Sequence, residues 1–85
     1  MLKVSVISPE QTLFEGEAES VTAPAFDGSV GILTGHAPMV TLLGNGELRL
    51  DGSNLVGARR FLVEGGFLQV ADDHVRVVTE RATTA

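Results

Sequence analysis

Short apolar segments separated by turn residues recur about every eight to ten residues, and this spacing constrains the fold more than any other feature. Within the segments apolar and polar side chains alternate, as Leu2, Val4 and Val6 do with their polar neighbours. Alternation places the two classes on opposite faces of an extended strand, and no sustained apolar recurrence at three and four residues indicates a helix. The pattern therefore predicts an all-β sandwich or barrel.

The alternation predicts strands over residues 2–8, 14–24, 40–43, 47–50, 54–58, 60–64, 67–71 and 74–79. Gly44-Asn45-Gly46 and Asp51-Gly52 are typical of hairpin turns with positive φ, so two hairpins are expected in series. Gly65-Gly66 and Asp72-Asp73 are expected to separate later strands. The 85 residues show no composition break, so one domain is expected over residues 1–80, followed by a flexible C-terminal tail over 81–85.

The composition excludes several classes of function. Six basic and eleven acidic side chains give a net charge of −5, which disfavours binding to nucleic acid. The chain has no cysteine, so neither disulfides nor thiolate metal sites hold it together. Its apolar runs are far shorter than the roughly 20 residues of a membrane-spanning helix, and the N-terminus lacks the apolar core of a signal peptide. We therefore expect a cytoplasmic chain without direct membrane insertion.

One segment, residues 28–39, combines three glycines and a proline around a single histidine: Gly28, Gly31, Gly35, His36 and Pro38. Glycine loses the most freedom on folding, so this density predicts a shaped loop with left-handed turns or close backbone approach. If Gly31 has positive φ, a valine there should lower the free energy of unfolding by more than about 1 kcal/mol. The spacing matches no phosphate-binding glycine motif, so the loop is interpreted as a contact surface.

The titratable residues do not form a pattern typical of an active site. No motif supplies His36 with an orienting partner, so it is interpreted as a structural or contact residue. Asp72, Asp73 and His74 have side chains that can ligate metals, but adjacent residues at a tight turn diverge, and a plain hairpin turn is predicted. Carboxylates at alternate positions are expected to face solvent: Glu15, Glu17 and Glu19. No catalytic, metal-binding or cofactor-binding residue is assigned, which predicts a binding module without a small-molecule substrate.

Four segments together form a specific pattern: Gly28-x-x-Gly31-Ile32-Leu33-x-Gly35-His36-Ala37-Pro38, Gly65-Gly66-Phe67-Leu68-Gln69-Val70, Val6-Ile7-Ser8-Pro9-Glu10 and Leu13-Phe14-x-Gly16. From residue 2 to residue 80 the chain resembles the amino-terminal domain of the epsilon subunit of F-type ATP synthases. The resemblance implies a flattened ten-stranded β-sandwich that acts as a non-catalytic rotor part of the central stalk. It also implies binding to the gamma subunit and the membrane c-ring at the cytoplasmic face of the membrane, and a role in coupling ion translocation to ATP synthesis.

The resemblance also implies two groups of contact residues. The c-ring side would include Asp27, Gly28, Ser29, Val30 and Gly31. The gamma side would include Ser8, His36 and Glu64. Where many relatives have an acidic residue and a proline, this chain has Ser29 and Thr34, which implies a weaker electrostatic contact with the ring. Most members continue into two C-terminal helices that can regulate ATP hydrolysis, so the resemblance implies either a naturally short member without that helical domain or a fragment.

Two other functions stay open at this point. A free-standing small-ligand-binding β-barrel would line its pocket with phenylalanines that are more simply explained as core residues: Phe14, Phe26, Phe61 and Phe67. Such a pocket needs a few hundred Å³, which a chain of this length can hardly enclose while packing a core. An enzyme would need His36 and His74 close to a carboxylate.

Overall fold

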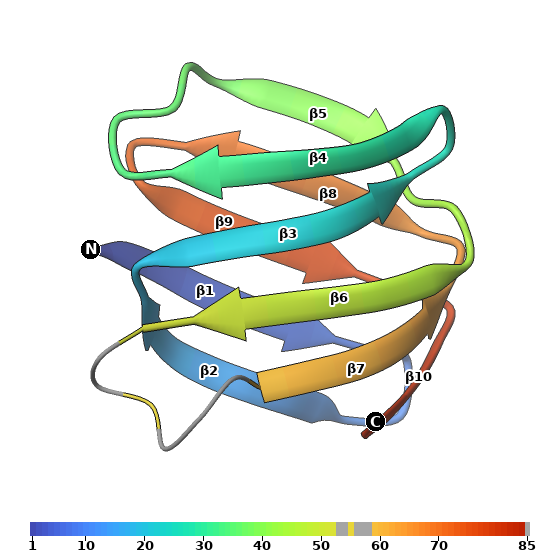
Figure 1. Ribbon diagram of the computed structural model, residues 1–85. Helices are drawn as coiled ribbons and strands as arrows, with labels where there is room; N and C mark the ends of the chain where they lie inside the picture. Colours follow the sequence, from blue (N-terminus) through green and yellow to red (C-terminus); the bar gives the residue numbers. More distant parts are fainter. Residues whose placement is uncertain (53–54, 56–58, 85) are drawn as a thin grey trace.

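Two five-stranded sheets pack face to face in the computed structural model, which describes residues 1–52, 55 and 59–84 (Figure 1). The first sheet has the order β2-β1-β9-β8-β5 and the second the order β10-β7-β6-β3-β4, and within the sheets only β1 and β9 pair in parallel. The strands are β1 (Leu2–Ile7), β2 (Thr12–Ala18), β3 (Ser20–Ala25), β4 (Gly28–Leu33), β5 (Met39–Leu42), β6 (Gly46–Asp51), β7 (Arg59–Glu64), β8 (Phe67–Ala71), β9 (His74–Val78) and β10 (Arg81–Thr84). The prediction of a ten-stranded all-β sandwich is confirmed.

The predicted alternation places the core between the two sheets. In β1, Leu2, Val4 and Val6 are buried while Lys3 is exposed. The inner faces of the other strands contribute further fully buried side chains, of which the largest are Phe61, Ile32, Leu48, Leu50 and Leu68. Two apolar faces that interdigitate in this way resist sliding of one sheet over the other.

The chain passes from the first sheet to the second at Glu19, so the single strand predicted over residues 14–24 is wrong. β2 buries Ala18 and β3 buries Val21, which means that the buried positions change from even to odd numbers. The change of phase is needed because the strand must keep its apolar face inward after it has changed sheets. The Glu19 amide holds the corner by donating to the Asp51 carbonyl oxygen at 2.7 Å.

The hairpin predicted around residues 44–46 is also wrong, because its two strands lie in different sheets. β5 pairs with β8 in the first sheet, whereas β6 pairs with β3 and β7 in the second. Neither Gly44 nor Gly46 has positive φ, and a Cβ on Gly44 would instead lie 3.1 Å from the Ala25 carbonyl oxygen. The glycine therefore allows the crossover to pass close to β3. A local turn sequence predicts a change of direction but not the sheet that the next strand will join.

β6 and β7 are antiparallel neighbours with Leu48 opposite Phe61, but β7 begins only at Arg59 and neither Asp51 nor Gly52 has positive φ, so the second predicted hairpin, with its tight turn at Asp51-Gly52, is wrong. The strand predicted over residues 54–58 lies outside the described residues except for Leu55. The Leu55 amide donates to the Gly52 carbonyl oxygen at 3.0 Å.

Half of the glycine-rich segment is strand rather than loop. β4 lies at the edge of the second sheet, and the turn that follows it covers residues 34–38. Positive φ occurs at Gly28 (132°) and Gly35 (85°), whereas Gly31 has none, and a Cβ there would meet nothing within 4 Å. The expectation of positive φ at Gly31 is wrong, and with it the reason for a large loss of stability in a valine variant.

Residues 81–84 form a strand where a flexible tail was predicted. β10 pairs with β7 and extends the edge of the second sheet, so the tail prediction is wrong for these residues. The connection before β10 contains the buried Thr79, whose hydroxyl lies 3.2 Å from the Glu64 carbonyl oxygen and 3.0 Å from that of Arg81. Pairing with β7 supplies the backbone hydrogen bonds that keep this short polar segment in place.

We expect Thr79→Val to lower the free energy of unfolding by about 1 to 2 kcal/mol, because it removes the hydroxyl of a buried side chain that bonds the Glu64 and Arg81 carbonyl oxygens while keeping the shape of the side chain. Urea denaturation followed by circular dichroism measures the change. Thr79→Ser keeps the hydroxyl and reports the loss of the methyl group alone. An unchanged urea midpoint for Thr79→Val would show that the hydroxyl does not stabilise the connection.

Candidate functional site

The turn that follows β4 has a geometry that depends on one glycine. The His36 amide donates to the Leu33 carbonyl oxygen at 3.1 Å and closes a four-residue turn. Gly35 is the third residue of this turn and has φ 85°. A type II turn requires positive φ at that position, where a residue with a side chain is strained. Gly35 therefore makes possible the turn that presents His36.

Asp73 connects this turn to a hairpin far away in the sequence. Asp72 and Asp73 form the turn between β8 and β9 with φ 49° and 61°, so the predicted hairpin turn is confirmed. The Asp73 carboxylate accepts a hydrogen bond from the Gly35 amide at 2.7 Å, and the Asp73 carbonyl oxygen accepts one from the Lys3 amide at 2.8 Å. Sequence reasoning missed this role, because the pair of aspartates indicated a turn but not its neighbours.

The His36 ring is held by a backbone oxygen one residue away. Its Nδ1 lies 2.6 Å from the Ala37 carbonyl oxygen. Because a carbonyl oxygen can only accept, Nδ1 must carry the proton, and Nε2 of the neutral ring is then an acceptor. The half-buried ring thus has one nitrogen committed to the backbone and one available to a partner. This arrangement supports the interpretation of His36 as a contact residue.

Ser8 and Glu64 lie at the opposite end of the sandwich from His36. The Thr79 amide donates to the last residue of β1, directly before Ser8, and the Thr79 hydroxyl lies 3.2 Å from the Glu64 carbonyl oxygen. β1 begins beside the Asp73 turn and ends here, and its six residues span about 17 Å. The structure therefore brings Ser8 and Glu64 to one end but does not bring His36 to them.

The residues that the resemblance assigns to the c-ring side are contiguous. Asp27 is in the two-residue turn between β3 and β4, and residues 28–31 form the exposed edge strand that follows. Phe26 in the same turn is 68% exposed, and its amide donates to the Leu42 carbonyl oxygen at 3.1 Å. The turn therefore lies beside the end of β5, at the end of the sandwich where β3 and β5 finish (Figure 1).

A row of apolar side chains crosses the outer face of the first sheet at this same end, and we call it the apolar stripe. The strand register places its four members side by side on β5, β8, β9 and β1: Leu42, Phe67, Val78 and Ile7. In β1, β8 and β9 these positions alternate with buried residues, so the side chains point outward. Leu42 is 63% and Phe67 is 37% exposed, which is typical of a surface that another protein covers. Sequence reasoning missed the stripe because its members come from four strands.

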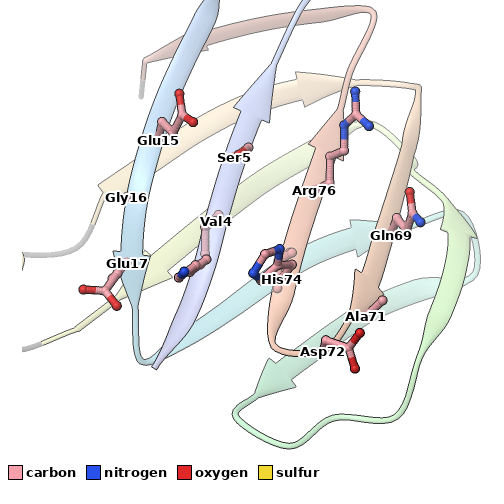
Figure 2. A pocket seen from close by; sticks show the side chains of 12 residues that line it. Val4, Ser5, Glu15, Gly16, Glu17, Gln69, Ala71, Asp72, His74 and Arg76 are labelled. Carbon is pink, nitrogen blue, oxygen red and sulfur yellow. The ribbon is translucent and has the colours of Figure 1, made fainter.

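Beyond the stripe this outer face carries the exposed Val40 and a group of mostly polar and charged side chains that line an open hollow of about 670 Å³. Figure 2 shows Glu15 and Glu17 on β2 and His74 and Arg76 on β9, with Ser5 on β1 between them. Lys3 on β1 lies opposite Glu17 on the neighbouring β2, whereas His74 and Arg76 are two strands away from the glutamates, so the charged side chains are spread over the face and do not converge on one point. The hollow therefore resembles a solvated sheet face more than a ligand pocket.

The four phenylalanines do not gather around a pocket. Phe61 is fully buried and Phe14 packs against the core, whereas Phe26 and Phe67 are exposed. None of them lines the hollow. The pocket expected for a small-ligand binder is therefore not formed by these residues, and the expectation that all four belong to the core is wrong for Phe26 and Phe67.

Residues 1–52, 55 and 59–84 contain neither a cluster of metal ligands nor a membrane-spanning helix. In this part of the chain, no three histidine, aspartate or glutamate side chains come together as metal ligands would. A helix of the length and apolarity that a bilayer span needs is likewise absent from the described residues. The exposed turns and the apolar stripe are the features that stand out chemically.

A family profile described as ATP synthase, Delta/Epsilon chain, beta-sandwich domain matches residues 1–85. The chain belongs to this family. The resemblance inferred from the glycine motifs is thereby confirmed. A family member from Rhodopirellula baltica named ATP synthase epsilon chain is 46% identical over 81 residues, covering 95% of this chain and 62% of its own length. Another of the same name from a Synechococcus strain is 45% identical over 83 residues, covering 95% and 58%. The chain thus spans about three-fifths of the length of these relatives.

Two solved structures contain a chain with the same fold. A chain of the Euglena gracilis mitochondrial ATP synthase, in a structure of OSCP, F1 and the c-ring, matches with a TM-score of 0.88 at 22% identity, over 98% of this chain and 52% of that chain. A chain of the Tetrahymena thermophila mitochondrial ATP synthase, in a structure of the central stalk and c-ring, matches with a TM-score of 0.76 at 21% identity, over 96% and 65%. At these identities the likeness shows the fold alone.

Proposed function

We propose that this domain is a non-catalytic part of the central stalk of an F-type ATP synthase, which binds the gamma subunit and the c-ring and couples ion translocation to ATP synthesis. Its relatives are named ATP synthase epsilon chains, and solved structures with its fold contain a central stalk or a c-ring. Such a part would sit at the cytoplasmic face of the membrane, peripheral to the bilayer. The role needs binding surfaces and stiffness rather than reacting groups.

The apolar stripe is the observation that carries the proposal. Its four side chains present a continuous apolar row at one end of the sandwich, with charged groups farther along the same face. An apolar centre with a polar surround is the usual composition of a protein–protein interface. The exposed Phe26 lies beside the stripe, because its backbone amide donates a hydrogen bond to the carbonyl oxygen of Leu42. A partner that covers this end removes Phe26, Leu42 and Phe67 from water.

The contact residues for the two partners remain part of the proposal, and their positions in the fold limit how each partner can reach them. Asp27 and residues 28–31, assigned to the c-ring, lie at the end that carries the apolar stripe. Ser8 and Glu64, assigned to the gamma subunit, lie at that end as well, whereas His36 lies about 17 Å away along β1. A gamma subunit that contacts all three must therefore extend along the length of the sandwich.

The fold suits a part that transmits torque. Each sheet is a ladder of backbone hydrogen bonds, and the two sheets share one continuous core. Close-packed interiors have low compressibility and transmit strain, so a force applied at one end reaches the other without much bending.

We expect Leu42→Asp to weaken binding to the purified gamma subunit or the detergent-solubilised c-ring by more than about tenfold, because binding would bury an unpaired charge. Isothermal titration calorimetry or a quantitative pull-down measures the affinity. Leu62→Asp is the matched control, because Leu62 is 51% exposed on the outer face of the second sheet. Wild-type affinity of Leu42→Asp for both partners would remove the stripe from the interface. Absence of binding by the unaltered domain would refute the proposed function itself.

A further inference from the structure

The Asp73 carboxylate bonds a backbone amide 38 positions away in the sequence, in the turn that presents His36. In a type II turn the amide of the third residue is not used by the turn's own hydrogen bond, so it needs a partner elsewhere. Asp73 supplies that partner at 2.7 Å. We propose that Asp73 is a positioning residue, which holds the His36 turn in the conformation that the gamma subunit binds. This inference rests on the proposed function.

The contact matters because the turn would otherwise be free to move. Gly35 is exposed and, as a glycine, has access to many backbone conformations once its amide is released to water. Binding would then have to order the turn, and the conformational entropy lost in doing so would weaken the affinity. When the Gly35 amide is bonded to Asp73, the turn has one conformation and His36 has a defined position. The ring orientation is fixed as well, because Nδ1 is bonded to the Ala37 carbonyl oxygen, which leaves Nε2 for a partner.

The carboxylate is not needed for the hairpin turn in which Asp73 lies. Both turn residues have positive φ, and glycine or asparagine fits such positions at least as well as aspartate. Asp72 shares this backbone conformation but does not bond residues 34–38, so it provides a matched control at the adjacent position. A stability role and a positioning role can therefore be separated by substitution.

The experiment measures the affinity of the domain for the purified gamma subunit together with its thermal midpoint. Asp73→Gly keeps the turn but removes the acceptor, and we expect roughly three- to tenfold weaker binding with a melting temperature close to that of the unaltered domain. Asp73→Asn keeps an acceptor without the charge and should bind like the unaltered domain. Asp72→Asn removes one charge from the same turn and should also leave the affinity unchanged. His36→Ala should weaken binding at least as much as Asp73→Gly.

The outcomes separate the inference from the proposed function. If the unaltered domain does not bind the gamma subunit, the proposed function fails. If binding occurs and His36→Ala weakens it but Asp73→Gly does not, the positioning role fails while the proposed function stands. If Asp73→Asn is as weak as Asp73→Gly, charge rather than the hydrogen bond is responsible and the inference is overturned. Should Asp73→Gly unfold, Asp73→Glu keeps the charge but displaces the acceptor, and wild-type affinity of that variant overturns the inference as well.

Discussion

Gly66→Ala is expected to prevent folding of the domain. A Cβ at this position would overlap the Val78 carbonyl oxygen and lie 2.7 Å from the Thr79 Cα, and Gly66 has φ 97°. These neighbours are backbone atoms of the last residue of β9 and of the residue that follows it, and they cannot move without disturbing the end of β9 in the first sheet. Strain from positive φ and the overlap together should cost more than about 4 kcal/mol. The whole domain is expected to have only about 4 to 13 kcal/mol of stability.

The measurement is the circular dichroism spectrum at 20 °C followed by urea denaturation. Gly31→Ala is the matched control, because a Cβ on Gly31 meets nothing within 4 Å and its φ is not positive. We expect that variant to stay within about 0.5 kcal/mol of the unaltered domain. A folded Gly66→Ala domain with an unchanged urea midpoint would show that β9 is not held against this glycine.

Gly66 also connects stability to the proposed binding end. Its carbonyl oxygen accepts a hydrogen bond from the Leu43 amide at 2.9 Å, and the next residue is Phe67 of the apolar stripe. The close approach of Gly66 to β9 therefore sets how β8 enters the first sheet. Gly66 is therefore expected to influence the geometry of the apolar stripe, although it is not itself a member of the stripe.

Phe61→Ala is expected to lower the free energy of unfolding by about 3 to 5 kcal/mol. Phe61 is 1% exposed and is the largest of the fully buried side chains, and it lies opposite Leu48 on the neighbouring strand. Its removal leaves a cavity between the sheets that the remaining side chains cannot fill, because interiors are close-packed. For a domain of this size the melting temperature should fall by at least about 12 °C.

The next residue in the chain provides the control. Leu62→Ala removes a side chain that is 51% exposed on the outer face of β7, and we expect a loss of no more than about 1 kcal/mol. Differential scanning calorimetry of the two variants compares an inner with an outer position on one strand. Similar melting temperatures for both variants would contradict the assignment of Phe61 to the core between the sheets.

The strands themselves are well predicted because their signal is local. Alternation of apolar and polar residues in β1 and in β7 to β9 follows from the two faces of a pleated strand, and each of these strands occurs where the alternation predicts it. The Asp72-Asp73 turn is predicted for the same reason, since the turn conformation depends on two adjacent residues. The motifs around Gly28 and Gly65 likewise identify the family.

Errors occur where the chain changes sheets. The change from even to odd buried positions between Ala18 and Val21 is visible in the sequence, and it could have indicated the corner at Glu19. Residues 44–46 carry no such signal, because a glycine-rich turn can join strands of one sheet or of two. β10 has few apolar residues and no alternation of apolar and polar side chains, so only its pairing with β7 identifies it as a strand.

The amino-acid sequence alone determined most of the strands, a glycine-dependent turn near Gly35 and the family, because these depend on residues close together in the chain. The tertiary structure alone decided the order of strands in the two sheets and therefore which distant side chains meet. The apolar stripe and the bond from Asp73 to Gly35 both depend on that order. Pairing between distant segments is set by the packing of the whole core, which no short stretch of sequence specifies.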